Sequence, residues 1–359
     1  MPEPFKNLLN AAVVADMAAR LRDAWPAFDA KRFKSLSLDG LDELEMKARA
    51  MHLCAALEAT LPEDFLQSAG ILQSAIEGGL SKWALWPVGE YIARHGLAQP
   101  ERALQVLHAL TQNFTAEFAI RPFILHHPEL TFATLDGWRT DASAHVRRLV
   151  SEGSRPRLPW GLQLKPLITD PSPTLPLLLA LMDDESDYVR KSVANHLNDI
   201  AKDHPQLIAD WLEQHLPGAS RQRQSLLRHA SRTLIKAGDP RVLAAFGQGA
   251  KFRGEARLAV SPRRIALGDA VTLDIALRPA GKKPQSLVID YAIHHVKANG
   301  GTSPKVFKGW TLELADARDL TRRHALKPIT TRRYFSGVHR IELLINGRVE
   351  ASADFALAC

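Results

Sequence analysis

Up to about residue 245, apolar residues recur every three or four positions, which is the spacing of one face of an α-helix. Helix-ending signals such as His95-Gly96 and Gln99-Pro100 separate these stretches. No strand-like alternation interrupts them, so the pattern predicts helices throughout residues 1–246. Two of the stripes are Leu104, Leu107 and Leu110, and Leu44, Ala48, Met51 and Ala55.

The pattern changes after a short glycine-bearing linker at residues 247–254 (GQGAKFRG). Beyond it, apolar and polar positions alternate, first at residues 271–277 and then at 286–296 and 305–314, as in half-buried strands. An Asn346-Gly347 pair between two further runs is typical of a hairpin turn. Short strands over residues 255–359 predict a β-sandwich.

An internal repeat lies within the helical part. Residues 141–150 (DASAHVRRLV) match residues 184–193 (DESDYVRKSV) at an Asp, a Ser, two Val, an Arg and a basic position, with an offset of 43 residues. A weaker copy lies near residues 227–230. A period of about 40–47 with two helices per unit predicts an α-solenoid of HEAT-like repeats. We expect the Asp and Ser to cap the second helix of each unit and the valines to fill the seam between units.

Composition limits the class of protein. The 359 residues are 46% hydrophobic, which excludes global disorder, and their number fits two or three domains. No apolar run approaches the roughly 20 residues of a membrane helix, and the acids and prolines of the first residues do not fit a secretory signal. The two cysteines, Cys54 and Cys359, cannot form a disulfide framework. We therefore expect a cytoplasmic protein.

The charge is divided unevenly along the chain. Residues 1–200 carry a net charge of −5 and residues 201–359 a net charge of +12, within an overall +7. An excess of basic residues at one end indicates a polyanionic partner, most simply nucleic acid. A basic surface that is merely solvated would look the same, so charge alone leaves both interpretations open.

A candidate site follows the first repeat. Glu152 ends the predicted helix 146–152, where the helix dipole disfavours an anion by about 0.3–1 kcal/mol. The loop after it carries Arg155, Arg157 and Trp160 and is stiffened by two prolines. Unfavourable local features that occur together often mark a functional site. The alternative is a surface ion pair between Glu152 and Arg155.

The repeat offset extends this site to the next unit. Glu152 corresponds to Asn195, on a predicted polar face with Ser192, Asp199 and Lys202. Since the second helices of such repeats line one side of a solenoid, we expect Glu152 and Asp199 to project into the same groove. Glu117 begins a helix in the preceding unit. A basic stripe lies beyond, at Arg221, Ser225, Arg228 and Arg232.

Three segments resemble the AlkC-type alkylpurine DNA glycosylases of the AlkC/AlkD HEAT-like repeat superfamily. They are residues 151–161 (SEGSRPRLPWG), 189–199 (VRKSVANHLND) and 117–122 (EFAIRP). The resemblance covers essentially the whole chain and implies an Ig-like fold for residues 255–359. It implies a monofunctional enzyme that removes N3-alkylated bases, such as 3-methyladenine or 3-methylcytosine, from double-stranded DNA without flipping the base.

The resemblance also implies roles for residues. Carboxylates would stabilise the positive charge that develops on the sugar and orient water, and Trp160 would pack against the lesion nucleotide. The implied catalytic residues are Glu117, Glu152, Trp160 and Asp199. The candidate DNA-binding residues are Arg121, Arg148, Ser154, Arg155, Arg157, Lys191, Asn195, Arg228, Arg332 and Arg333. Because residues 251–359 carry a net charge of +9, we expect this domain to close around the duplex.

Other features point away from cofactors. His126-His127 and His294-His295 lack Cys or acidic partners at ligand spacing, so we expect no metal, and no nucleotide-binding fingerprint occurs. Trp83 and Trp86 have the spacing of helix packing. We expect a monomer that binds DNA and no membrane. Two other functions stay open, namely a non-enzymatic scaffold for protein or damaged DNA and an RNA-binding scaffold.

Overall fold

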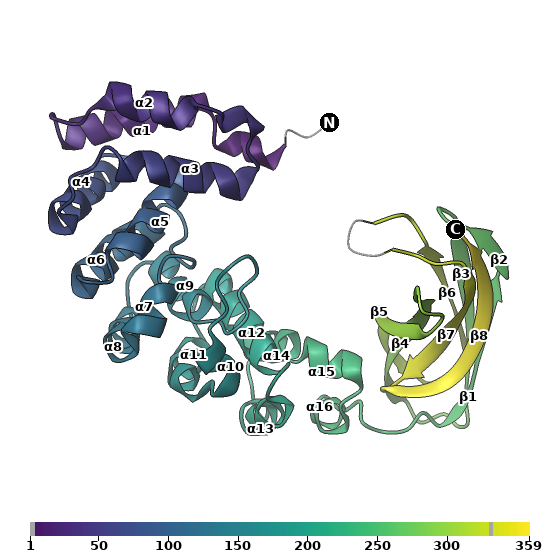
Figure 1. Ribbon diagram of the computed structural model, residues 1–359. Coiled ribbons are helices and arrows are strands. Elements are labelled where there is room, and N and C mark those ends of the chain that lie inside the picture. Colours follow the sequence, from purple (N-terminus) through teal and green to yellow (C-terminus); the bar gives the residue numbers. More distant parts are fainter. Residues whose placement is uncertain (1–3, 330–332) are drawn as a thin grey trace. The chain divides into compact units, whose positions relative to one another are not determined.

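In the described residues, helices follow one another up to Ala245, and the strands begin at Gly254 (Figure 1). The computed structural model describes residues 4–329 and 333–359. This order confirms the predicted fold class, an α-helical region followed by a β-rich one. No helix in the described residues is long and apolar enough to cross a membrane.

The helices of the first repeats are α1 (Ala11–Ala24), α2 (Ala30–Leu38), α3 (Met46–Glu58), α4 (Phe65–Glu77), α5 (Leu85–His95), α6 (Pro100–Thr111), α7 (Arg121–His126) and α8 (Pro128–Trp138). The later helices are α9 (Ala144–Gly153), α10 (Lys165–Thr169), α11 (Leu175–Leu181), α12 (Asp187–Ile200), α13 (Pro205–His215), α14 (Arg221–Ala230), α15 (Arg232–Ala237) and α16 (Pro240–Ala245). Short 3₁₀ turns join several of them, at Phe5–Leu8, Leu41–Glu43, Lys82–Ala84 and Ser172–Thr174.

The two predicted apolar stripes differ in how well the structure buries them. In α6, Leu104, Leu107 and Leu110 are all buried, as their spacing predicts. The second stripe lies on helix α3 except for Leu44, which precedes the helix, and Ala48 and Ala55 are exposed. The buried face of α3 is the neighbouring one, which consists of Arg49, Ala50, Leu53, Cys54, Ala56 and Leu57.

The repeat corresponds to a row of packed helices. Helices α9 and α12 are the second helices of the two units, and α12 packs between α9 and α14. Val146 and Val150 of α9, and Val189 and Val193 of α12, have no exposed surface. The prediction that valines fill the seam between repeats is therefore confirmed.

The caps of these helices differ in part from the prediction. Ser143 and Ser186 occupy the N-cap positions, but neither hydroxyl makes a capping hydrogen bond. Instead, Asp141 and Asp184 accept hydrogen bonds from the backbone N–H of these serines, at 2.7 and 2.8 Å. The aspartates therefore shape the turn before each helix, and the serine part of the prediction is wrong.

The contacts of the chain divide it into two units. Unit 1 is Met1–Asp203 with Arg221–Ala230, and unit 2 is His204–Ser220 with Ser231–Cys359. Helices α13, α15 and α16 thus group with the strands. The change from helix to strand falls at the predicted linker, since β1 begins at Gly254, whereas the division into units falls earlier. The domain limits 1–246, 247–254 and 255–359 stay a prediction.

Unit 2 contains two sheets that face each other across an apolar core. One sheet has the order β1-β3-β6 and the other β2-β8-β7-β4-β5. Core residues such as Leu273 of the first sheet and Ile341 and Phe355 of the second pack together, so the sheets form a sandwich. The strands are β1 (Gly254–Ser261), β2 (Arg264–Ala266), β3 (Ala270–Pro279), β4 (Gln285–Val296), β5 (Thr302–Leu314), β6 (Arg318–Ala325), β7 (Gly337–Ile345) and β8 (Arg348–Ala358).

The predicted hairpin turn joins the sandwich to its helices. Asn346 and Gly347 both have positive φ, 49° and 75°, between β7 and β8. The Asn346 side chain donates to the carbonyl of Ala250 at 2.8 Å, and its oxygen accepts from Val288 N–H. Gly347 lies against Gly238, which ends α15. Two glycines in contact let the backbones of helix and hairpin approach closely.

This contact predicts a loss of stability for Gly347→Ala. A Cβ at this position would lie 2.5 Å from the Cα of Gly238, so the two segments would have to separate. We expect the thermal unfolding midpoint of the full chain to fall clearly further than in Gly218→Ala. Gly218 has a similar φ of 69° but nothing within 4 Å, so its variant carries only the backbone strain of about 1–2 kcal/mol. Equal losses in the two variants would contradict the contact.

Candidate active site

Two arginines at equivalent repeat positions hold the turns before α9 and α12. Arg147 donates to the carbonyls of Asp141 and Ala142, and Arg190 donates in the same way to those of Asp184 and Glu185. Arg147 also binds the Asp184 carboxylate of the next repeat at 2.7 Å. Both arginines therefore have structural roles, and Arg147 also links its repeat to the next one.

Glu152 lies in the last turn of α9, and its carboxylate is buried and shared among three groups. One oxygen, Oε1, accepts from Arg155 at 2.6 Å and lies 3.5 Å from a guanidinium nitrogen of Arg148. The other oxygen accepts from the Ser192 hydroxyl of α12 at 2.6 Å. The Glu152–Arg155 pair that the sequence allowed does form, but its two side chains are only 8% exposed.

Asp199 lies on α12 and meets the same arginine. Arg155 donates from Nε to one oxygen of Asp199 at 2.8 Å, while Lys202 binds the other oxygen at 2.7 Å. Burial alone would lower the pKa of Arg155, but the charges of Glu152 and Asp199 and the hydrogen bonds that Arg155 donates to them outweigh burial and raise this pKa. Both acids therefore bind the same guanidinium, as expected for neighbouring helices, while their place in a common groove stays a prediction.

Glu117 completes the cluster from a turn before α7, not from within a helix as the sequence predicts. Its Oε2 accepts from the Thr115 hydroxyl at 2.7 Å and binds Arg148. The Arg148 guanidinium also lies 5.2 Å from the centre of the Tyr188 ring, within the range of a cation–π contact. Acids and bases therefore alternate through the site, in the order Glu117, Arg148, Glu152, Arg155, Asp199 and Lys202.

A buried arginine, Arg121, fixes the loop that follows α9. Arg121 has no exposed surface and donates to the carbonyls of Leu162, Gly153 and Pro156 at 2.5, 2.9 and 3.4 Å. Burial, followed by the charge of Arg155, lowers the pKa of Arg121 to about 10. The three acceptors span the loop from start to end, so Arg121 holds its course.

This loop presents apolar side chains to solvent. Trp160 is 75% exposed and Leu162 54% exposed. Trp160 has a φ of 63°, a left-handed conformation that costs a residue other than glycine about 1–3 kcal/mol. An exposed aromatic ring on a strained and firmly anchored loop is typical of a contact surface for a ligand.

Two of the predicted DNA contacts are contradicted by burial. Arg121 is enclosed as described, and Ser154 has no exposed surface and donates to the carbonyl of Val150. Arg155 is occupied by carboxylates on both sides, and Arg148 by Glu117 and Tyr188. All four residues therefore bind groups of the protein itself, which are the acids, the ring of Tyr188 and the backbone.

The other candidates keep surface. Arg157 binds Asp203 through two hydrogen bonds of 2.8 Å and remains a third exposed. Lys191 is two-thirds exposed, Asn195 and Arg228 are partly exposed, and Arg333 is exposed beside Phe335. Arg332 lies outside the described residues. Sequence reasoning missed Thr115, Tyr188 and Leu162 as members of the site, because none of them is unusual in its own local pattern.

The remaining candidates from the sequence contact other groups of the protein. Trp83 packs against Phe5, Trp86 and Phe114, in agreement with the prediction of helix packing. His127 lies 2.7 Å from the carbonyl of Leu97, and His294 lies 2.9 Å from Glu342. Among the described residues, no group of three or more His, Cys, Asp or Glu side chains could hold a metal ion.

Comparisons with known proteins give the family. A model of the DNA alkylation repair enzyme family matches residues 110–234, and one of the C-terminal Ig-like domain of the uncharacterised protein YhaZ matches residues 255–359. The uncharacterized protein YhaZ of Bacillus subtilis (strain 168) is 38% identical over 356 residues, 98% of each chain. The Pseudomonas fluorescens alkylpurine DNA glycosylase AlkC, solved bound to DNA containing an abasic site analog, is 37% identical, with a TM-score of 0.92. This match covers 99% of this chain and 100% of the other.

The chain belongs to the AlkC family of alkylpurine DNA glycosylases. The resemblance seen in the sequence is therefore confirmed, including the Ig-like C-terminal domain. The repair-enzyme match at 110–234 contains Glu117, Glu152 and Asp199. The segment that matches the repair-enzyme family thus supplies the acidic cluster.

A histidine beneath the cluster predicts the pH dependence of stability. His196 of α12 is fully buried, its Nδ1 lies 2.9 Å from the carbonyl of Ser151, and burial lowers its pKa to about 3. The unfolded chain, with a histidine pKa near 6.5, binds this proton more readily, so stability is lost as the pH falls below about 6.5. Between pH 7 and pH 5 this residue should cost about 2 kcal/mol.

Denaturant unfolding at the two pH values measures this difference. We expect His196→Gln, whatever its stability at pH 7, to lose less stability on acidification than the natural protein. The matched control is His145→Gln, because His145 is exposed and its variant should keep the full pH dependence. An unchanged pH dependence in His196→Gln would exclude this histidine as the cause.

Proposed function

We propose that this chain is a DNA glycosylase that hydrolyses the N-glycosidic bond of N3-alkylated bases in duplex DNA. The proposed substrates are 3-methyladenine and 3-methylcytosine. The observation that carries the proposal is the cluster of three carboxylates, drawn from separate segments and held together around arginines. Membership in the AlkC family supports the same activity.

The chemistry of the lesion fits an acidic site. Alkylation at N3 makes the base cationic, so it leaves as a neutral molecule when the C1′–N bond breaks and the bonding electrons pass to its ring. Positive charge then develops on the sugar, and carboxylates held in place beforehand stabilise this charge without reorganisation. Water adds its oxygen to C1′, and its proton passes to a carboxylate or to solvent.

Glu117 is the carboxylate best suited to face the sugar and the water. Both oxygens of Glu152 and both of Asp199 are bound by protein groups. In contrast, Glu117 uses Oε2 for Thr115 and Arg148, and no group in the described chain donates to its Oε1. In this proposal Glu117 acts on the reacting atoms, while Glu152 and Asp199 position the arginines and add negative potential.

Trp160 is proposed to contact the lesion nucleotide from outside the helix. Its ring is three-quarters exposed on a loop that Arg121 fixes, so it can pack against a nucleotide that stays stacked. A sugar that gains positive charge beside the ring face would also gain cation–π attraction. These features support cleavage without base flipping, in which selectivity comes partly from the lability of the lesion itself.

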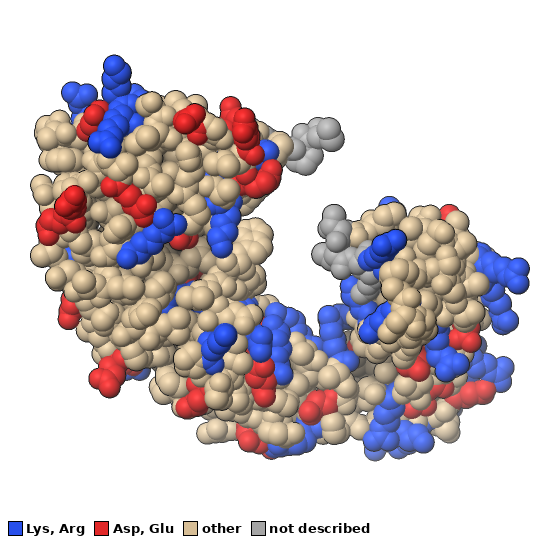
Figure 2. All heavy atoms as spheres, in the orientation of Figure 1, with Lys and Arg blue, Asp and Glu red and all other residues tan. Residues whose placement is uncertain are grey.

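The proposed partner is double-stranded DNA, bound by a monomer. Exposed basic residues around the cluster, including Lys191 and Arg157, are suited to phosphates. Figure 2 shows basic side chains gathered on the surface over α12 and α14. The reaction as proposed needs no metal ion, and it would take place in the cytoplasm.

Base release tests the proposal directly. The purified protein should release 3-methyladenine from methylated duplex DNA in the presence of EDTA. Glu117→Gln should slow release about 100- to 1,000-fold, because it removes charge stabilisation from the transition state, while its affinity for a duplex with an abasic-site analogue stays the same. Glu129→Gln, an exposed change on α8, is the control and should be fully active.

Two outcomes would contradict this proposal. Full activity of Glu117→Gln would exclude its assigned role. Duplex binding by the natural protein without release of any alkylated base would favour a non-enzymatic scaffold instead.

Glu152→Gln should reduce both activity and stability. The substitution leaves Arg155 and Arg148 buried without one of their charge partners, which costs about 3–5 kcal/mol for a broken buried ion pair. We expect a lower thermal unfolding midpoint together with slower base release. A variant with normal stability and no release would show instead that Glu152 itself acts on the substrate.

A further inference from the structure

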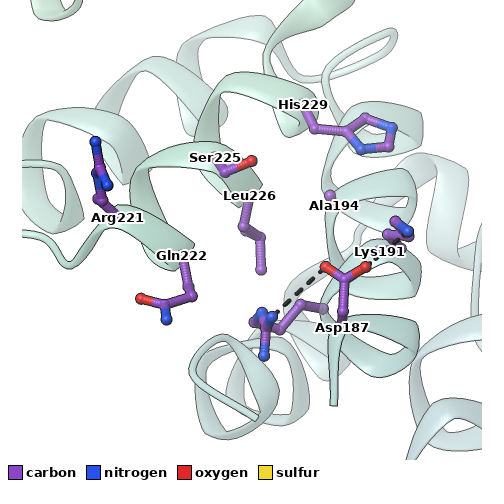
Figure 3. A pocket seen from close by; sticks show the side chains of 9 residues that line it. Asp187, Lys191, Ala194, Arg221, Gln222, Ser225, Leu226 and His229 are labelled. Carbon is purple, nitrogen blue, oxygen red and sulfur yellow. Dashed lines mark hydrogen bonds and ion pairs between the residues drawn. The ribbon is translucent and has the colours of Figure 1, made fainter. Parts of the chain in front are cut away.

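A pocket lies one helix beyond the acidic cluster. Between α12 and α14 the surface is hollowed into a pocket of about 330 Å³. Its walls carry Lys191 and Asp187 on α12 and Arg221, Gln222 and Ser225 on α14 (Figure 3). The proposed cleavage reaction leaves this pocket without a role.

The repeat relates the pocket to the acidic cluster. Lys191 corresponds to Arg148 by the 43-residue offset. Arg148 reaches Glu117 and Glu152, whereas Lys191 lies beside α14. Helix α12 therefore contributes to both sites, because its Ser192 contacts the acidic cluster while its Lys191 lines the pocket.

The charge of the pocket is positive. Its one acid, Asp187, binds Lys191 at 2.6 Å and lies 3.5 Å from Arg190, so its charge is more than balanced. Arg221 is exposed on the opposite wall and forms no ion pair within the described residues. Three cations face one carboxylate, which leaves a surplus of positive charge for an anion.

The neutral groups of the pocket suit an anion that accepts hydrogen bonds. The Ser225 hydroxyl and the Gln222 amide can donate, and neither has a hydrogen-bond partner in the described chain. Leu226 and Ala194 also line the pocket. A phosphodiester group carries one negative charge and only accepting oxygens, so it matches this set of donors.

We propose that this pocket binds a single phosphodiester group of the DNA duplex, near the lesion. Packed helices lie about 8–10 Å apart, and successive phosphates of each strand are about 3.4 Å apart along the axis of the duplex. The bound phosphate therefore lies within about three nucleotides of the lesion. This assignment rests on the proposed function, since it takes DNA as the ligand.

The test replaces phosphates one at a time. A set of duplexes carries an abasic-site analogue, 5′-hydroxyl ends and one neutral methylphosphonate at successive positions around the analogue. The natural protein should lose about tenfold in affinity at one position within three nucleotides, whereas Arg221→Ala should be weak on every duplex and lose less than about twofold there. On the unmodified duplex, the slope of log affinity against log salt should be shallower by about 0.9 in Arg221→Ala.

Two further variants separate charge from folding. Arg221→Lys keeps a cation in the pocket and should retain most of the salt slope. The double change Lys31→Ala and Lys34→Ala removes two exposed charges from α2 and should leave the methylphosphonate profile unchanged. Since Arg221 is exposed in the first turn of α14, its replacement by alanine should not disturb folding.

The outcomes distinguish this assignment from the proposed function. If the natural protein binds the duplex and releases the alkylated base, but Arg221→Ala responds to every methylphosphonate as the natural protein does, only the pocket assignment is overturned. If the natural protein does not bind duplex DNA, both proposals are overturned. A methylphosphonate effect that disappears in Arg221→Ala supports the pocket even where no base is released.

Discussion

The burial of three carboxylates against two arginines is the constraint on which the rest of the site depends. A carboxylate can be buried only when cations and hydrogen-bond donors replace the water that it loses. Here Arg148 and Arg155 each bind two of the acids, so no acid can move without its neighbours. The repeats supply this arrangement because they place α9 and α12 side by side.

The same constraint shapes the loop that carries Trp160. Arg155 begins this loop and is fixed by Glu152 and Asp199, and Arg121 then holds its backbone from below. The left-handed conformation of Trp160 is stable only because these contacts determine the course of the chain around it. The acidic cluster and the exposed ring therefore depend on each other, because the buried ion pairs hold the loop that presents Trp160 to solvent.

Much of this organisation could be predicted from the sequence. The 43-residue offset located α9 and α12 and placed Glu152 and Asp199 close together, because a repeat fixes relative position as well as secondary structure. The alternation at 271–277 and the Asn346-Gly347 pair located strands and a hairpin, since both signals are local. The family followed from short segments around the acids.

The partners of individual side chains could not be predicted. An arginine in a loop looks the same whether it faces solvent or a buried carboxylate, so Arg121 and Arg155 were expected on DNA and lie inside the protein instead. The stripe chosen for α3 had the right period but lay on the exposed side, because alanines fit either face of a helix. Tyr188 and Thr115 joined the site through contacts between distant segments, which no local pattern records.

Helix α12 has almost no surface on which its sequence is free to drift. Its valines form the seam with the neighbouring repeats. Ser192 donates to Glu152, Asp199 is one of the three acids, and Lys191 lines the pocket between α12 and α14. A substitution at nearly any position of this helix would therefore disturb one of these contacts. Evolutionary variation in this part of the protein should instead accumulate in helices that keep more exposed surface, such as α13.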